Sequence, residues 1–317
     1  MRLWLWWCVL GCVLVLSSGG VAEAKVCGGE VACACGDQVV GDAVLTEDLL
    51  GCGGNGLRLR VDATLDCDGH AITGSGDGWG ITLDRTKGAE VRGCHVSGFR
   101  TGLRMRGGGG NFVENNEFVG NSRYGVEFSR ASTGNIVDGN LILDSGDEGI
   151  HVGSGADWNV ILRNDVRGSG DENIYLLDVR HVFVIANTLA DSGGAAVYFK
   201  HAVDSALIWN SIEDRVVHIR GASTGNLIAV NFLVGAGYVL EAYEEKAKRE
   251  RVPAGWSAPT DNRILGGTIE GAATCFRFAG ASDNVVEGVR VDGCRASRAS
   301  TRGGRAASAN SVSLLPL

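Results

Sequence analysis

The chain has 317 residues, with 49 glycines, only 3 prolines and a formal net charge of −8 at pH 7. The acidic balance argues against a nucleic-acid partner, because phosphate binding normally requires a basic face. A chain rich in glycine and poor in proline favours many short strands joined by tight turns, since glycine accepts the positive φ that such turns need.

Residues 1–24 are predicted to be a signal peptide. Arg2 precedes an apolar run of 14 residues at 3–16, and Ala22-Glu23-Ala24 forms a small-x-small cleavage site. The run is short for a membrane span, so none is expected after cleavage. A retained anchor, or a lipoprotein modified at Cys12, is the alternative. We expect an exported protein, secreted or periplasmic.

Residues 25–60 are predicted to form a Cys-rich N-terminal cap. Cleavage leaves eight cysteines, four of them within 27–52. An even number in an exported chain favours disulfides, which would pin a cap over an open sheet edge. The Cys33-x-Cys35 spacing is not that of a zinc site, and the pairing of the cysteines stays open.

From residue 111 the chain repeats a pattern of Asn, four residues, a second Asn and an apolar triplet. The second asparagine falls at 116, 140, 164, 187, 210 and 231, which gives steps of 24, 24, 23, 23 and 21 residues. A second feature recurs after these asparagines at a similar period: a small or polar residue followed by an aliphatic one, as in Gly125-Val126 and Gly149-Ile150, which we call the Gly-Ile-like step. We expect the asparagines to stack about 4.8 Å apart in a hydrogen-bonded ladder, with their own backbones in the left-handed turn conformation.

A period near 23 residues leaves two architectures, leucine-rich repeats or a β-helix. The leucine-rich pattern is missing, and Val, Ile and Phe alternate with polar residues and glycine. The sequence therefore predicts an all-β fold, a right-handed parallel β-helix of about nine or ten coils spanning residues 61–295.

Two segments depart from the period. Residues 241–260 hold about 13 extra residues, read as a polar loop or short surface helix, with a lid over a groove as the alternative. The tail, residues 296–317, is rich in Ser, Ala, Arg and Gly and is predicted to be disordered.

The repeats, together with the segment from Cys35-Gly36-Asp37 to residues 65–74 (LDCDGHAITG), resemble the exported right-handed β-helix repeat proteins of bacteria. The resemblance covers residues 35–294. It implies membership of the pectate-lyase-like superfamily, which includes polysaccharide lyases, glycoside hydrolases, mannuronan epimerases and the periplasmic accessory protein of nitrous-oxide reductase. The Asp-Pro-His-Asp run of the mannuronan epimerases is absent, as are the motifs of polygalacturonases, so the resemblance implies the scaffold rather than one chemistry.

Alignment of the coils on the Gly-Ile-like step predicts one outward-facing residue per coil in a single row. The row is Thr82, Arg104, Glu127, His151, Tyr175, Tyr198 and His218. Two residues further along lie Asp84, Arg106, Ser129, Gly153, Leu177, Lys200 and Arg220. Just before the strands lie Arg123, Tyr124, Asp147, Glu148, Asp171 and Glu172. Polar and aromatic groups are thus expected to converge on one face.

Such a row suits a glycan, with aromatic rings packing on sugar faces and cations pairing with uronate carboxylates. For lyase or epimerase chemistry, Arg104, Lys200 or Arg220 would neutralise the uronate, and His151 or Tyr175 would abstract the C5 proton. The residues assigned catalytic roles are His151, Tyr175, Glu127 and Arg104. Those assigned to substrate binding are Tyr198, Lys200, His218, Arg220, Asp147, Glu148, Asp171 and Glu172.

Hydrolysis would instead need two carboxylates about 5–9 Å apart, for which Glu127 with Asp147, or Glu148 with Asp171, are the expected pairs. No cofactor is predicted, although adjacent acids would suit Ca²⁺. An exposed strand face is also polar in proteins without any site there, because cross-strand charge pairs stabilise a sheet.

Two functions therefore stay open. The first is an exported, monomeric protein that binds a polysaccharide or oligosaccharide of the uronate type and cleaves or modifies it, as a polysaccharide lyase, epimerase or glycoside hydrolase. The alternative is a non-catalytic β-helix module that binds glycan or supports an assembly of the periplasm or cell surface.

Overall fold

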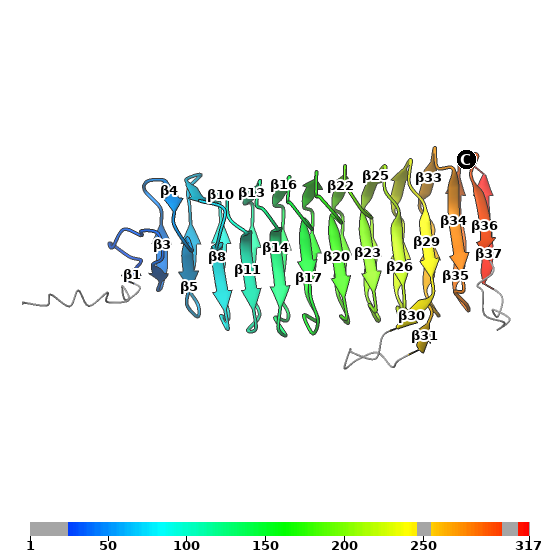
Figure 1. Cartoon of the computed structure of the whole chain (residues 1–317), viewed down its shortest axis with the longest axis horizontal. Coiled ribbons are helices and arrows are strands. Elements are labelled where there is room, and N and C mark those ends of the chain that lie inside the picture. The colour runs from blue at the N-terminus through cyan, green and yellow to red at the C-terminus, as the bar shows by residue number, and fades with distance from the viewer. Residues whose placement is uncertain (1–24, 246–254, 300–309, 317) are drawn as a thin grey trace, which may run out of the picture.

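The protein is an elongated parallel β-solenoid in a computed structural model that describes residues 25–245, 255–299 and 310–316 (Figure 1). It has about eleven turns. Every regular element in these ranges is a strand, so none of them holds a helix that could cross a membrane. Each turn contributes one short strand to each of three rows, which run along the rod.

Row 1 is a 13-stranded parallel sheet. Its strands are β1 (Val26–Cys27), β2 (Gln38–Val39), β5 (Leu57–Leu59), β8 (Trp79–Asp84), β11 (Thr101–Arg106), β14 (Tyr124–Ser129), β17 (Ile150–Val152), β20 (Ile174–Leu177), β23 (Val197–Lys200), β26 (Val217–Arg220), β29 (Tyr238–Glu241), β34 (Thr274–Ala279) and β36 (Arg295–Ala299).

Rows 2 and 3 together form the 22-stranded sheet. Row 2 consists of β3 (Asp42–Val44), β6 (Thr64–Asp66), β9 (Glu90–Arg92), β12 (Phe112–Glu114), β15 (Ile136–Asp138), β18 (Val160–Leu162), β21 (Phe183–Ile185), β24 (Ala206–Ile208), β27 (Leu227–Ala229) and β32 (Arg263–Leu265). Row 3 consists of β4 (Leu49–Cys52), β7 (Ala71–Gly74), β10 (His95–Ser97), β13 (Glu117–Val119), β16 (Leu141–Leu143), β19 (Asp165–Arg167), β22 (Thr188–Ala190), β25 (Ser211–Glu213), β28 (Phe232–Val234) and β33 (Thr268–Glu270). The long strands β35 (Val285–Val291) and β37 (Ser311–Pro316) complete both rows.

The core is a continuous apolar column inside the three rows. Successive side chains of a strand point to opposite faces, so every second residue enters the solenoid. In row 1 the inward residues Ile81, Leu103 and Val126 stack on successive turns and are fully buried. The side chains between them therefore face outward, which fixes the row where the candidate site lies.

Two buried asparagine ladders run along the corners of row 2, as the repeat predicts. In the ladder that begins at Asn116, the Oδ1 of Asn164 accepts hydrogen bonds from the backbone N–H and the side-chain Nδ2 of Asn140, both at 3.0 Å. Asn164 Nδ2 donates in turn to the Oδ1 of Asn187 at 3.0 Å. The predicted left-handed backbone belongs to the residue before each asparagine instead, for example Arg163 at φ 52°. A side chain can satisfy buried backbone groups only if its own residue points inward, so the outward-facing neighbour makes the turn.

The Gly-Ile-like step has a steric origin. Gly80, Gly102, Gly125 and Gly149 stand at matching points at the start of successive row 1 turns. A Cβ on Gly149 would lie 2.4 Å from Val166 Cγ1 and 2.8 Å from the carbonyl oxygen of Asn173. The glycine thus lets the incoming chain pack directly on the next turn.

The change Gly149→Ala is therefore expected to destabilise the protein by about 1–3 kcal/mol, because the core must shift to accept the methyl group. Thermal unfolding followed by circular dichroism measures the effect. Gly54→Ala is the matched control, since a Cβ there meets no atom within 4 Å and the residue has no left-handed φ. Equal melting temperatures for the two variants would contradict this account.

Disulfides pin both ends of the solenoid. Cys27–Cys33 and Cys35–Cys52 lie in the first turns, Cys67–Cys94 ties two neighbouring turns, and Cys275–Cys294 lies near the C-terminal end. The expectation that the eight cysteines form disulfides is confirmed. Residues 25–60 contribute strands to the solenoid itself, because β2 and β5 pair within row 1. Their role as a cap stays a prediction.

The number of turns and the structure of the insertion differ from the predictions. The solenoid has about eleven turns instead of nine or ten, because strands at both ends continue it. In the insertion, β30 (Tyr243–Glu245) and β31 (Gly255–Ser257) form an antiparallel pair at the lower edge of the rod in Figure 1. The residues between them, and the predicted signal peptide at 1–24, lie outside the described residues.

The prediction of a disordered tail is wrong for its described part. Strand β36 pairs with β34, and β37 pairs with β35. Asn310 extends an asparagine ladder by accepting from Asn284, and Val312 and Leu314 pack against the core. An apolar alternation after a ladder asparagine is enough to add a turn, whatever the composition of the residues before it.

Candidate functional site

The row 1 register brings the outward-facing residues together in the predicted order. Arg104 pairs with Thr82 on one side and Glu127 on the other. The same column continues through His151, Tyr175, Tyr198 and His218 on β17, β20, β23 and β26. The functional roles given to these residues remain predictions, but their alignment makes a continuous surface.

Five rings stack along this surface, and we call Tyr124, His151, Tyr175, Tyr198 and His218 the ring ladder. The four successive ring-centroid distances are 4.6, 5.5, 5.3 and 4.7 Å. The first and last pairs are close to parallel, at 18° and 7°. Tyr124 and His151, and likewise Tyr198 and His218, therefore pack face to face, while Tyr175 is tilted against both of its neighbours, at 46° and 51°.

The expected packing of aromatic rings on sugar faces stays a prediction. Within the two stacked pairs the facing ring surfaces are occupied by the neighbouring ring. The tyrosine hydroxyl and imidazole nitrogens are the hydrogen-bonding groups of the ladder. Tyr124, placed just before its strand by the sequence but given no role, starts the ladder because its ring reaches His151 on the next turn.

Carboxylates line one edge of the ring ladder. Glu148 and Glu172 precede β17 and β20 and are 6% and 8% exposed. Burial, together with the charges of Asp171 and Glu148, raises the pKa of Glu172 to about 8. A carboxyl group with this pKa keeps its proton at neutral pH and can donate a hydrogen bond.

His151 is held in a defined position. Its Nδ1 lies 3.3 Å from Glu148 Oε1, and its ring lies between those of Tyr124 and Tyr175. A carboxylate partner at Nδ1 favours the tautomer with the proton on Nδ1, which leaves Nε2 as an acceptor. A Cβ on Gly153 would come within 3.2 Å of that Nε2, so the glycine keeps space beside it.

At the C-terminal end of the ladder, Arg220 and His218 each contact a neighbouring polar side chain. Arg220 Nη1 donates to the hydroxyl of Tyr198 at 3.2 Å, and His218 Nε2 lies 3.2 Å from Glu241 Oε2. Burial lowers the pKa of His218 against the opposing effect of Glu241, and burial raises the pKa of Tyr198. The sequence interpretation missed Glu241, although it follows Arg220 directly in the column of β26 and β29.

At the N-terminal end, Arg104 occupies a structural position. Its Nη2 contacts both carboxylate oxygens of Asp84, at 3.1 and 2.9 Å, and its guanidinium lies 3.5 Å from the centre of the Trp79 ring. The side chain is buried, so its expected role in neutralising a substrate carboxylate is unsupported. Glu127 lies between Arg104 and His151 and is half-buried.

Comparison with known proteins identifies the family. Residues 37–271 match the periplasmic copper-binding proteins named NosD, which is more than half of the chain. The protein belongs to the NosD family. No curated protein matches this NosD-family chain.

Solved structures share the fold at low identity. The Dettilon tailspike protein is 13% identical at a TM-score of 0.60, over 88% of this chain, which spans 60% of the tailspike's length. The A-module of the mannuronan C-5 epimerase AlgE6 from Azotobacter vinelandii is 13% identical at 0.60, over 93% and 87% of the two chains. The periplasmic alginate epimerase AlgG is 11% identical at 0.59, over 82% and 76%. These likenesses establish the β-helix fold.

The family membership confirms the predicted location, secreted or periplasmic, because NosD proteins are periplasmic. The four disulfides fit that location, since they persist in oxidising compartments.

Copper does not fit the described residues of this NosD-family chain. Copper in proteins prefers Cys, Met and His ligands, but the eight described cysteines form disulfides and Met105 is fully buried in the core. His151 and His218 are three turns apart. In the described ranges, no three His, Cys, Asp or Glu side chains are placed to hold a metal ion. Calcium binding by the adjacent acids stays a prediction.

Proposed function

We propose that the protein binds a uronate-type extracellular polysaccharide along the ring ladder and abstracts the C5 proton of a bound uronate through His151. The placement of His151 carries the proposal: Glu148 holds Nδ1, and Gly153 leaves space beside Nε2. Two proteins of similar fold act on mannuronan or alginate according to their names. Proton transfer by a positioned histidine accelerates a reaction by about 10²–10⁴-fold.

Each neighbouring group has a part in this proposal. Lys200 and Arg220 lie in register on β23 and β26 and would pair with the uronate carboxylate. The protonated Glu172 would donate a hydrogen bond to the same carboxylate as negative charge develops on it. Tyr175, one turn from His151, would donate the second proton: in an elimination to the O4 oxygen that leaves as the C4–O bond breaks, and in an epimerisation to C5 on the face opposite to His151.

The test uses polymannuronate and polygalacturonate with two readouts. Ultraviolet absorbance of the C4–C5 double bond detects elimination, and deuterium incorporation at C5, read by NMR, detects proton abstraction without cleavage. We expect His151→Ala to lower the rate by at least 100-fold. His95→Ala is the control, because His95 is an exposed histidine of row 3 paired with Glu117. An unchanged rate in His151→Ala would refute the assignment.

A second candidate is glycoside hydrolysis, favoured by the raised pKa of Glu172. A buried carboxylic acid that keeps its proton at neutral pH suits the general-acid role. Release of reducing ends from a polysaccharide, lost in Glu172→Gln, would select this reaction. Glycan binding without any product in either assay would select the non-catalytic module.

A further inference from the structure

A pocket lined by arginines opens on the N-terminal part of row 1, beyond the ring ladder. Its lining consists of Arg58, Arg60, Asp84, Arg85, Arg106, Gly107 and Arg130, and we call it the arginine pocket. Its volume is about 470 Å³, within the range of small-ligand sites. The proposed chemistry uses none of these residues.

The strand register of β5, β8, β11 and β14 builds this pocket. Arg58 lies in the outward column next to Thr82, and Arg106 pairs with Asp84 and Ser129 two residues further along. Arg85 and Arg130 follow the ends of β8 and β14 in the left-handed conformation, at φ 56° and 49°. Four successive turns thus deliver arginines to the same edge of the sheet.

The charges in the pocket are not balanced. Asp84 is its only carboxylate, and both Asp84 oxygens already bind Arg104 from outside the lining. Arg58 Nη2 is 3.8 Å from Asp84. Within the described ranges, Arg60, Arg85, Arg106 and Arg130 make no ion pair. Five guanidiniums thus line one pocket of a chain whose net charge is −8, which concentrates positive charge there.

Gly107 keeps the pocket open between two of the arginines. A Cβ there would lie 3.6 Å from the carbonyl oxygen of Arg130 and 3.7 Å from Arg85 Cγ. Those are ordinary contact distances, so the backbone has room for a side chain. The neighbouring turns carry arginine at matching left-handed positions, which shows that a glycine is not required for the turn itself.

We propose that the arginine pocket binds carboxylates of the polysaccharide at subsites remote from His151, which makes the ligand a polyanionic chain bound across both regions. The planar guanidinium matches a carboxylate in a two-point geometry. Strands β11 and β17 are two strand spacings apart, about 10 Å at the usual spacing of parallel strands, and Arg106 lies two residues further along than the column of His151. This inference rests on the proposed function, because it names the acidic class of its ligand.

The test measures binding by isothermal titration calorimetry in a His151→Ala background, so that no turnover occurs. The probes are mannuronate oligomers of two lengths, a trimer and an octamer, with a neutral mannan octamer as reference. We expect the double change Arg106→Gln and Arg130→Gln to weaken octamer binding at least tenfold and to lower the ratio of octamer to trimer affinity. Gly107→Asn, which fills the pocket without removing charge, is expected to have the same effect, since asparagine accepts the left-handed turn.

Arg263→Gln is the matched control, an exposed arginine of row 2 far from the pocket. Unchanged octamer affinity in both pocket variants would overturn the inference, even if His151 proves catalytic. Arginine-dependent octamer binding without turnover by the unmodified protein would support the pocket while the proposed chemistry fails. Binding of inorganic phosphate or a sulfated heparin octamer at the pocket, with no mannuronate binding, would overturn the uronate assignment.

Discussion

Replacement of Asn164 by alanine is expected to lower the free energy of unfolding by about 4–6 kcal/mol. Asn164 makes four hydrogen bonds through its side chain, to Asn140, Val137 and Asn187. Its loss leaves the buried backbone N–H of Asn140 without an acceptor, which costs about 1–3 kcal/mol, and each of the other lost bonds adds about 1 kcal/mol. The turns on both sides are affected, because Asn164 is hydrogen-bonded to Asn140 on one neighbouring turn and to Asn187 on the other.

Urea and thermal unfolding, followed by circular dichroism, measure this effect. The control is Asn115→Gly, which removes an exposed asparagine whose backbone has φ 53°, a conformation that glycine accepts. We expect little change in that variant. A melting temperature for Asn164→Ala equal to that of the control would show that the ladder does not stabilise the solenoid.

The change Glu172→Gln is expected to stabilise the protein at alkaline pH. The pKa of Glu172 is raised from 4.5 to about 8, chiefly by burial. A carboxyl group with a raised pKa in the folded state contributes its full stability below pH 4.5 and loses it progressively as the pH rises to about 8. The neutral amide removes this loss, by up to about 3–5 kcal/mol at pH 9.

The measurement is the difference in unfolding free energy between Glu172→Gln and the unmodified protein at pH 5 and pH 9. We expect a small difference at pH 5 and a large one at pH 9. Glu287→Gln, an exposed glutamate of β35, serves as the control and should show no such pH dependence. A constant difference across the range would mean that Glu172 ionises normally. A gain in stability with a loss of turnover would mark Glu172 as a group retained for function.

The sequence predicts the solenoid well, because turns of nearly constant length place the same kinds of buried residue, the ladder asparagines and the inward apolar residues, at regular intervals along the chain. The steps between ladder asparagines anticipate the register that places His151 beside Tyr175. The composition of residues 296–317 does not predict the C-terminal turn, because Asn310 and the apolar alternation after it carry the structural information. Asn262 and Asn284 continue the same ladder toward it.

The candidate site was only partly predictable. Strand alternation gives the row of outward residues but not the tilt of a ring, so the stacked faces of Tyr198 and His218 could not be foreseen. The partners of Arg104 could not be foreseen either, because Trp79 and Asp84 reach it from the preceding turn. The arginine pocket combines residues of strands with residues of the turns that follow them. Because these residues occupy different positions in the repeat, no single column of aligned residues reveals the pocket.

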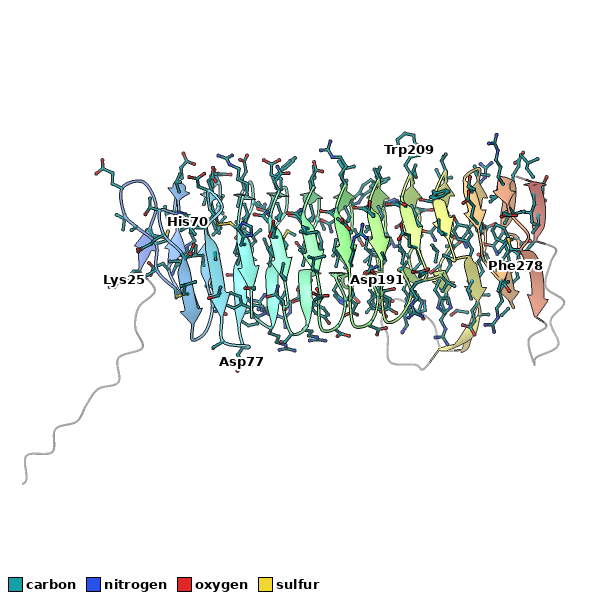
Figure 2. The ribbon with its side chains drawn as sticks, turned by 90° about the horizontal axis from the view of Figure 1, so that it is seen from above. Lys25, His70, Asp77, Asp191, Trp209 and Phe278 are labelled. Carbon is teal, nitrogen blue, oxygen red and sulfur yellow. A yellow bond between two sulfur atoms is a disulfide. The ribbon has the colours of Figure 1, made fainter. Side chains whose placement is uncertain are left out.

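The distribution of the disulfides bears on how the molecule comes apart. In a solenoid each turn contacts only its neighbours, so loss of structure starts at a free end and advances one turn at a time. Figure 2 shows the rod with Lys25 near one end and Phe278 near the other, and the four covalent links lie in these end regions. Fraying that starts at either end therefore meets a covalent link before it reaches the central turns. These links stabilise the turns that carry the ring ladder without using any residue of their outer face.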